Sequence, residues 1–227
     1  MAHSMKSILF FLSLFLSTAS AVETSLPRVL ILGDSVYNNP TQIIAKELKG
    51  RVEVVYAKTN PGECLHSGIS FARIDEIVGT GKWDLIYFNF GLGDLIYKAP
   101  GISSMRVLPK DAGGVRVSSP EKYEKNLQAI VTHLKATKAK LVWASTTPIA
   151  RSADNLFDVD SEIEYNAIAA KIMTKEKVPI NDMHAYILSQ REPINSKRQS
   201  NDPFIFEREI IFHTPMVEII LNQLGLK

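Results

Sequence analysis

Five short apolar runs divide the chain into a repeating pattern. They span residues 29–32, 52–56, 85–90, 141–145 and 178–181. Each run has the length of a β-strand, and most of them lack the polar alternation of a strand with one face in water. Continuous apolar runs are typical of strands that are buried on both faces of a parallel sheet. The pattern therefore predicts five strands in the interior of the molecule.

Segments with helical spacing lie between the apolar runs. Apolar residues recur three and four positions apart in residues 43–48, 123–134 and 163–173, and a last helix is expected over residues 215–224. Strands and helices therefore alternate along the chain. This alternation predicts an α/β fold of three layers (α/β/α), because right-handed crossovers place helices on both faces of the sheet. We expect a doubly wound, parallel, five-stranded sheet with the flavodoxin-like strand order 2-1-3-4-5.

One segment, residues 96–120, does not fit this alternation. It contains six prolines and glycines, at positions 100, 101, 109, 113, 114 and 120. Its apolar residues follow no sustained helical or strand period. We therefore expect a long loop that leaves the end of the third strand. Long loops in compact domains are either functional or plain surface insertions, and both alternatives stay open for this one.

The N-terminal residues have the pattern of a secretory signal peptide. Lys6 is followed by an apolar stretch over residues 8–16 and by Ala19-Ser20-Ala21, a small-residue pattern that suits signal peptidase. We expect cleavage after Ala21, a single domain over residues 22–227, and a secreted or periplasmic protein. The apolar stretch is about half as long as the roughly 20 residues that cross a bilayer, so no stable membrane span is expected. An uncleaved anchor or a lipid attachment is the alternative.

The composition excludes several classes of partner and cofactor. Lys and Arg number 26 against 24 Asp and Glu, which is too balanced for a nucleic-acid-binding surface. The single cysteine, Cys64, cannot form an intramolecular disulfide and is interpreted as a small buried residue. The histidines and carboxylates do not have the regular spacing of zinc ligands, so no metal or other cofactor is expected. The oligomeric state cannot be predicted from these features.

A candidate nucleophile follows the first apolar run directly, in the tripeptide Gly33-Asp34-Ser35. Open α/β sheets bind ligands beyond the carboxyl ends of their strands, so the hydroxyl of Ser35 is expected where a substrate would arrive. The tripeptide is not a dinucleotide fingerprint, a phosphate-binding loop or the nucleophile elbow of α/β-hydrolases. A serine after a strand is also a common helix N-cap, so Ser35 is either a nucleophile or a cap.

Glycine-containing turns follow the second and third apolar runs. Asn60-Pro61-Gly62-Glu63 comes after the second run, and Gly91-Leu92-Gly93-Asp94 comes after the third. A glycine in such a turn can present its backbone N–H to a ligand, although a tight turn alone would also explain it. The three strand ends are expected to meet at one crevice of the sheet.

His213 is the candidate general base, because a histidine can take the proton of a serine hydroxyl during attack on an ester. It lies between an apolar run and the last expected helix. The other histidines are less persuasive. His133 lies within an expected helix, His184 opens another, and His66 lies in the loop after the second strand, where a substrate contact is one alternative.

The order of these motifs resembles the SGNH/GDSL hydrolase family over essentially the whole mature chain. That family has G-D-S at the first strand, a glycine after the second, G-x-N-D after the third and D-x-x-H before the last helix. Residues 81–92 and 143–148 are similar to a secreted bacterial branch. The resemblance implies that Ser35 is the nucleophile and His213 the base. It also implies an oxyanion hole formed by Ser35, Gly62 and Gly93, with Asp34 and Asp94 as supporting residues.

Two positions depart from the family pattern. Gly93 stands where the family has an asparagine that donates to the oxyanion, and the loss of one such donor costs about 10²–10³ in turnover. Ile210 stands where the family has the aspartate that orients the histidine. Glu209 or Glu207 could take that place from a shifted loop, or a backbone carbonyl could orient His213. We prefer a Ser-His dyad, because the orienting acid contributes less than the nucleophile or the base.

Two functions follow as hypotheses. The first is a serine esterase of the SGNH type that removes a small acyl group through an acyl-enzyme on Ser35, with an acetylated carbohydrate as a candidate substrate on the analogy with the family. The second is a catalytically impaired relative that binds a saccharide or a protein ligand in the same crevice. For a working dyad, we predict a hydrogen bond between Ser35 Oγ and a ring nitrogen of His213.

Overall fold

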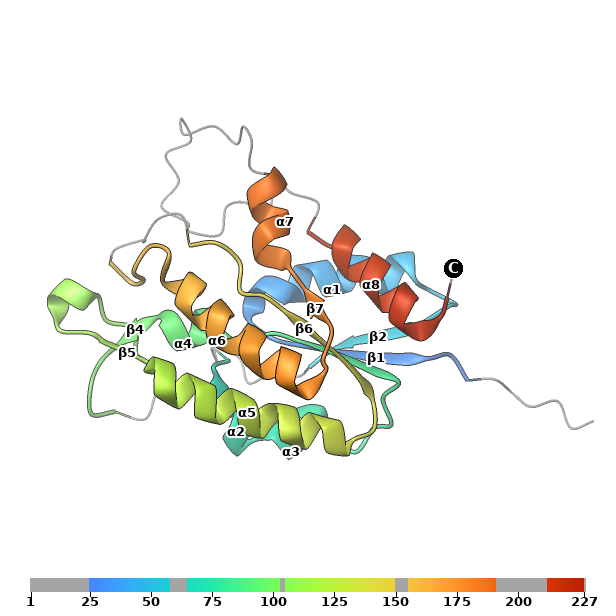
Figure 1. Ribbon diagram of the computed structural model, residues 1–227, viewed down its shortest axis with the longest axis horizontal. Helices are drawn as coiled ribbons and strands as arrows, with labels where there is room; N and C mark the ends of the chain where they lie inside the picture. Colours follow the sequence, from blue (N-terminus) through green and yellow to red (C-terminus); the bar gives the residue numbers. More distant parts are fainter. Residues whose placement is uncertain (1–24, 58–64, 103–104, 150–154, 191–211, 227) are drawn as a thin grey trace, which may run out of the picture.

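A parallel five-stranded sheet runs through the centre of the molecule (Figure 1). The computed structural model describes residues 25–57, 65–102, 105–149, 155–190 and 212–226. Its central strands are β1 (Arg28–Leu32), β2 (Glu53–Tyr56), β3 (Leu85–Phe88), β6 (Lys140–Ala144) and β7 (Ile180–Asn181). They lie in the order β2-β1-β3-β6-β7, which is the predicted order 2-1-3-4-5 when only these strands are counted. The predicted fold class is therefore confirmed.

Burial explains why the five apolar runs became strands. Every residue of β3 is buried, and β3 pairs in parallel with β1 on one side and with β6 on the other. Helices cover both faces of the sheet, so neither face needs polar side chains. A strand in this position has to be apolar at every residue, which is the pattern found in the sequence.

Two layers of helices enclose the sheet (Figure 1). One face is covered by α1 (Asn38–Glu47) and α8 (Thr214–Leu224). The other face carries α2 (Ser67–Ala72), α3 (Ile74–Val78), α5 (Pro120–Ala136) and α6 (Ser161–Glu176). A further helix, α7 (Met183–Gln190), extends from the end of β7. The four helices expected from the sequence all have counterparts here. The short helices α2 and α3 were not expected.

Helix α5 shows how the sequence produces one of these layers. Its apolar face consists of five buried residues at helical spacing, namely Tyr123, Leu127, Ile130, Val131 and Leu134. The helix begins with Pro120 at its first turn, and the Ser119 side chain accepts a hydrogen bond from the N–H of Lys122 at 3.3 Å. Proline at the first turn and serine at the N-cap both favour the start of a helix, so α5 begins where the sequence places these residues.

The segment expected to be a long loop contains regular structure, so this expectation was wrong. Strands β4 (Tyr97–Lys98) and β5 (Val115–Arg116) pair antiparallel, and a 3₁₀ turn, η2 (Lys110–Ala112), lies between them. Gly113 follows η2 with φ of 89°, a left-handed conformation that glycine adopts without strain. Residues 96–117 are called the insertion below.

Asp158 attaches the insertion to the connection that precedes α6. Its carboxylate accepts hydrogen bonds from the hydroxyl of Tyr97 at 2.6 Å, from Lys110 at 2.7 Å and from Arg116 at 2.5 Å. Partial burial opposes ionisation, but the hydrogen bonds from Lys110 and Tyr97 hold the pKa of Asp158 below its ordinary value. Three donors from the insertion therefore converge on one carboxylate.

Within the described residues, no helix combines the length and the apolar character that a bilayer crossing requires. The expected signal peptide lies outside the described residues, as do Cys64 and Gly62.

Replacing Asp158 is expected to loosen the insertion and destabilise the fold. Asp158→Ala should lower the free energy of unfolding at pH 7 by about 2 kcal/mol, because Arg116 and Lys110 lose a charged partner. A carboxylate whose pKa is lowered stabilises the fold above its unfolded pKa. The difference from wild type should therefore shrink as the pH falls below about 4. Urea titrations at pH 7 and pH 3 measure both effects.

The matched control is Asp111→Ala, which removes another carboxylate of the same insertion. The Asp111 carboxylate accepts a hydrogen bond from Asn155 and is not bonded to any of the three donors that Asp158 holds. Its effect should be under about 1 kcal/mol. Equal stability of wild type and Asp158→Ala at pH 7 would show that Asp158 does not hold the insertion.

Candidate active site

Ser35 lies at the carboxyl end of β1, where the sequence analysis placed it. It opens the 3₁₀ turn η1 (Ser35–Tyr37), and it is exposed between two buried neighbours, Asp34 and Val36. The hydroxyl of Tyr56, at the end of β2, donates to the carbonyl oxygens of Gly33 at 2.9 Å and Asp34 at 3.0 Å. The adjacent strand therefore holds the turn that presents Ser35.

The hydroxyl of Ser35 does not act as a helix cap. The residue in the N-cap position of η1 is Asp34, and no side-chain cap is formed there. Within the described part of the chain, Ser35 Oγ makes no hydrogen bond. Ser35 is therefore exposed, and its hydroxyl is not committed to a structural partner among these residues.

A small cavity opens beside Ser35. Its volume is about 150 Å³, and it is lined by Asp34, Ser35, Val36, Leu92, Gly93, Ile96 and Phe157. Four of these side chains are apolar. They come from η1, from the turn after β3, from the start of the insertion and from the connection before α6. The carboxyl edge of the sheet therefore provides a mainly apolar pocket next to an exposed serine.

Asp34 and Asp94 are buried supports of this edge rather than solvent-facing groups. One oxygen of Asp34 accepts the N–H of Leu92 at 3.2 Å, while Asp34 Oδ1 has no partner among the described residues. Burial, together with the nearby charge of Asp94, raises the pKa of Asp34 to about 8, although the N–H groups of Gly93 and Leu92 oppose this shift. Asp34 therefore holds its proton at neutral pH.

Asp94 joins the turn after β3 to the start of α2. Its carboxylate accepts the N–H of Ser67 at 2.9 Å and the hydroxyl of Ser67 at 2.6 Å. Burial raises the pKa of Asp94 above its ordinary value, although the hydrogen bonds from Ser67 oppose this shift. The two aspartates that the resemblance marked as supporting residues therefore join the ends of β1 and β3 to the start of α2.

The position of Gly93 has no room for a side chain. A Cβ atom on Gly93 would lie 1.9 Å from the carbonyl oxygen of Leu65, a backbone atom that cannot rotate away. The N–H of Gly93 faces the carboxylate of Asp34. The backbone of Leu65 thus excludes a side-chain donor at the position where the family pattern has an asparagine. The third expected member of the oxyanion hole, Gly62, lies outside the described residues.

His213 does not lie next to Ser35 in this structure. It directly precedes α8, and its Nε2 is 3.8 Å from Oε2 of Glu47. Glu47 is the last residue of α1, whereas Ser35 lies just before the first, and ten helical residues rise by about 15 Å. Within the described residues, no hydrogen bond joins Ser35 to His213, so the predicted contact is not formed.

The immediate surroundings of His213 are partly described. The ring of Phe212 packs edge-on against Tyr37, with 5.4 Å between ring centroids. The candidate orienting acids Glu209 and Glu207 lie outside the described residues, as does Ile210. The catalytic roles of Ser35 and His213 therefore remain predictions.

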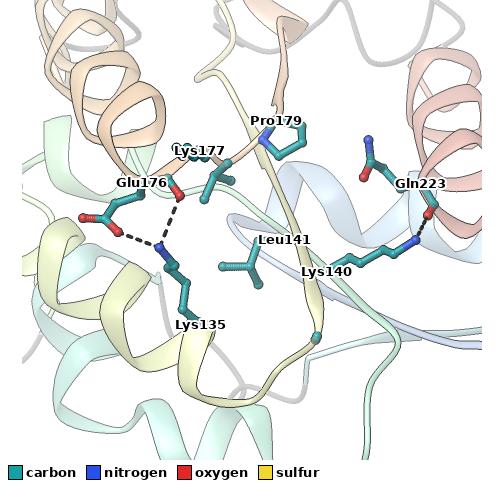
Figure 2. A pocket seen from close by; sticks show the side chains of 9 residues that line it. Lys135, Lys140, Leu141, Glu176, Lys177, Pro179 and Gln223 are labelled. Atoms are coloured by element: carbon teal, nitrogen blue, oxygen red, sulfur yellow. Dashed lines mark hydrogen bonds and ion pairs between the residues drawn. The ribbon is translucent and has the colours of Figure 1, made fainter.

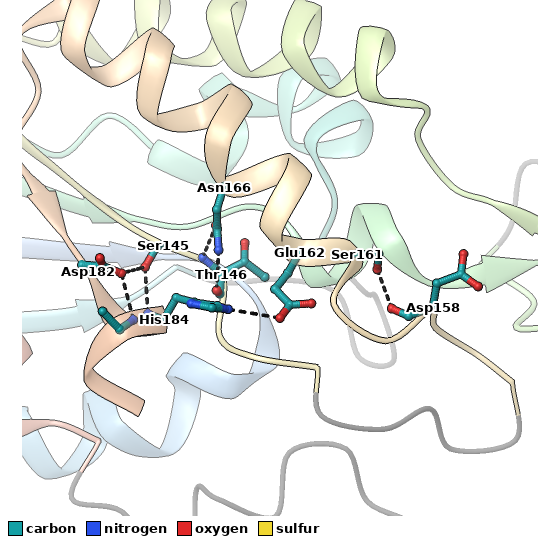
Figure 3. Close-up of polar contacts among 9 residues, drawn as sticks. Ser145, Thr146, Asp158, Ser161, Glu162, Asn166, Asp182 and His184 are labelled. Carbon is teal, nitrogen blue, oxygen red and sulfur yellow. Dashed lines mark hydrogen bonds and ion pairs between the residues drawn. The ribbon is translucent and has the colours of Figure 1, made fainter. Parts of the chain in front are cut away.

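A histidine that the sequence analysis considered less persuasive, His184, belongs to a polar cluster at the ends of β6 and β7 (Figure 3). Its Nε2 lies 3.1 Å from Oε1 of Glu162, a carboxylate that is only 1% exposed. Ser145 donates to Asp182 at 2.9 Å and accepts the N–H of His184 at 2.8 Å, so its hydroxyl is already committed. The sequence signal for this cluster was Asp182-Met183-His184 directly after a strand.

The remaining histidines have local roles. His66 accepts the N–H of Gly68 at 3.2 Å, and Nε2 of His133 lies 3.2 Å from Oδ1 of Asp75. Across the described ranges, no group of three or more histidine, cysteine or acidic side chains is arranged to hold a metal ion.

A larger hollow lies at the opposite, amino edge of the sheet (Figure 2). Its volume is about 360 Å³, and its polar side chains include Lys135, Lys140 and Lys177. Lys135 pairs with Glu176 at 2.8 Å, and Lys140 donates to the carbonyl of Gln223 at 2.5 Å. Lys135 lies in the last turn of α5 and Lys177 follows α6 directly, while the side chain of Lys140 reaches from β6 to the C-terminal turn of α8. Cations at these helix C-termini are stabilised by the helix dipole. Helix capping accounts for them, so the size of this hollow does not make it the candidate site.

Removing the ionisable group of Asp34 is expected to change the pH dependence of stability. Because its pKa is raised, the folded protein holds a proton that the unfolded protein has lost between about pH 4 and about pH 8. Wild type should therefore lose stability as the pH rises through this window, by up to roughly 1.4 kcal/mol per pH unit. Asp34→Asn should lose less, so its stability relative to wild type should rise from pH 5 to pH 9 in urea titrations. A constant difference between the two proteins would contradict this.

Comparison with known proteins shows which fold the chain has. No model of a known protein family matches the chain, and no curated protein matches it in sequence. Among solved structures, it is similar to an acetyl xylan esterase, with a TM-score of 0.64 and 17% identity over 85% of this chain and 99% of that one. A lipase/acylhydrolase from Enterococcus faecalis gives a TM-score of 0.63 and 13% identity over 89% and 98% of the two chains.

A third structure, a GDSL-like lipase from Bacteroides thetaiotaomicron, gives a TM-score of 0.57 and 15% identity over 86% of this chain and 88% of that one. All three comparisons cover most of both chains. The sheet order and these similarities lead to one conclusion: the chain has the fold of the SGNH/GDSL hydrolases.

Proposed function

We propose that the chain is a serine esterase of the SGNH type that removes a small acyl group from its substrate, with Ser35 as the nucleophile. The observation that carries this proposal is the exposed, uncommitted hydroxyl of Ser35 at a small cavity with mainly apolar walls. A nucleophile beside an apolar pocket suits attack on an ester whose acyl chain enters the pocket. The esterase and acylhydrolase structures with the same fold support this assignment.

The size of the cavity indicates the size of the acyl group. A volume of about 150 Å³ corresponds to the share of roughly five water molecules in the liquid. An acetyl group or a slightly longer acyl chain fits this space, and a long fatty acyl chain does not. The similarity to an acetyl xylan esterase favours an acetylated carbohydrate as the substrate. The expected signal peptide is consistent with such a substrate outside the cytoplasm.

The proposed reaction proceeds through an acyl-enzyme. Ser35 Oγ attacks the carbonyl carbon of the ester as its proton passes to His213, and backbone N–H groups of Ser35 and Gly62 stabilise the oxyanion. The bond to the alcohol then breaks, and the imidazolium returns the proton to the leaving oxygen. Water then attacks the acyl-enzyme as His213 takes its proton, and the bond between the acyl carbon and Ser35 Oγ breaks as the imidazolium returns that proton to Oγ, which releases the carboxylic acid and restores Ser35. For these steps, the imidazole of His213 has to leave Glu47 and approach Ser35.

Two specific observations favour a second candidate function, the binding of a saccharide or a protein without catalysis. The carbonyl of Leu65 leaves no room for a side-chain donor at position 93, and His213 contacts Glu47 instead of Ser35. A crevice with these features can bind a ligand but lacks part of the machinery for acyl transfer.

Replacing the proposed nucleophile tests the first function. Ser35→Ala should lower the rate of p-nitrophenyl acetate hydrolysis by at least about 100-fold, since no other hydroxyl among the described residues lines this cavity. Ser189→Ala is the matched control, because Ser189 is an exposed serine near the end of α7, and its rate should equal that of wild type. Equal rates in wild type and Ser35→Ala would remove Ser35 as the nucleophile.

Labelling with a fluorophosphonate separates the two candidate functions. An activated serine is modified covalently, so wild type should carry the label on Ser35, as located by peptide mass spectrometry. The labelling rate should fall at least about 10-fold in His213→Ala if His213 is the base. A wild-type protein that remains unlabelled while it binds saccharides or a protein would support the second function.

A further inference from the structure

The far wall of the cavity at Ser35 comes from two segments that are distant in the chain. Ile96 is the first residue of the insertion, and Phe157 lies in the connection that precedes α6. Phe157 is 8% exposed, and Ile96 is half-buried. Neither side chain belongs to the strand ends that position Ser35. The depth of the cavity therefore depends on how these two segments are held together.

Tyr97 holds both segments in place. Its N–H donates to the carbonyl of Leu156 at 2.9 Å, and its hydroxyl donates to the carboxylate of Asp158 at 2.6 Å. The residue directly after Ile96 is thus bonded to the residues on either side of Phe157. One tyrosine consequently fixes the two apolar side chains relative to each other.

Charge strengthens this contact. Besides Tyr97, the carboxylate of Asp158 accepts hydrogen bonds from Lys110 and Arg116, and both of these cations also lie over the ring of Tyr97, at 5.5 Å and 5.8 Å from its centroid. The backbone carbonyl of Asp158 accepts the hydroxyl of Ser161, the first residue of α6 (Figure 3). Asp158 therefore links the insertion to helix α6.

We infer that Ile96 and Phe157, held by the Tyr97–Asp158 contact, close the acyl pocket and set the longest acyl chain that the protein accepts. This inference rests on the proposed function and deepens it. Ile96 and Phe157 determine specificity by direct contact with the acyl chain. Asp158 is a positioning residue, because it acts only through the segment that carries Phe157.

The ratio of kcat/KM values for hexanoate and acetate p-nitrophenyl esters measures this role. Wild type should prefer acetate at least about 10-fold. Phe157→Ala should raise the hexanoate/acetate ratio at least about 10-fold, because a pocket discriminates roughly 10- to 200-fold for each methylene that it admits or excludes. Ile96→Ala should raise the ratio as well. Asp158→Asn should raise it about 3-fold, since the wall is loosened but still present. A substitution that only impairs folding would lower kcat/KM for both esters to the same extent and leave their ratio unchanged.

The matched control is Phe71→Ala, the same substitution at a phenylalanine of α2 that is 46% exposed and does not line the cavity. It should keep the wild-type ratio. Should Phe157→Ala fail to fold by circular dichroism, Phe157→Leu and Ile96→Ala decide the result. An unchanged ratio in the folded variants at both positions would overturn the inference.

A binding measurement separates this inference from the proposed function, because it needs no nucleophile. Nuclear magnetic resonance titrations with acetamide, butyramide and hexanamide report the chain length that the pocket admits. Hexanamide should bind Phe157→Ala at least about 5-fold more tightly than wild type, while acetamide should show little change. If wild type hydrolyses no ester and Ser35 is not labelled, the proposed function fails, and the amide titrations still decide on the pocket. Equal hexanamide affinities in wild type and Phe157→Ala would overturn the inference.

Discussion

The turn after β3 packs so closely against its neighbours that two of its residues have no room for a side chain. A Cβ atom on Gly91 would lie 1.8 Å from the hydroxyl of Thr146, and one on Gly93 would lie 1.9 Å from the carbonyl of Leu65. This close approach brings the N–H of Leu92 to Asp34 and the carboxylate of Asp94 to Ser67. The position of Ser35 and the floor of its cavity follow from these contacts, because they join the ends of β1 and β3 to the start of α2.

Two different kinds of interaction thus build the two sides of the candidate site. The side that carries Ser35 is held by buried hydrogen bonds of Asp34, which keeps its proton at neutral pH, and of Asp94. The opposite side is held by the charged contacts of Asp158 with Lys110 and Arg116, which are partly exposed to water. Exposed ion pairs are weakened by salt, whereas buried hydrogen bonds are not. The Ser35 side is therefore the more constant of the two.

The sheet could be predicted from the sequence because its physical cause is local. Buried parallel strands such as β3 are apolar throughout, and right-handed crossovers leave few possible strand orders. The location of Ser35 follows for the same reason, because it lies one turn after β1. The insertion could not be predicted, since its short strands depend on Asp158, which lies in a different segment. The side chain of His213 contacts Glu47 on α1, and nothing in the residues around either position indicates that contact.

The carbonyl of Leu65 limits how this chain can change by mutation. An asparagine at position 93 would collide with a backbone atom, and moving that atom would disturb the segment that Asp94 holds through Ser67. A single substitution therefore cannot install the side-chain donor that the family pattern has at this position. A side chain at position 93 requires that the backbone of Leu65, just before α2, moves as well. Changes at these two positions are therefore coupled, in evolution as in engineering.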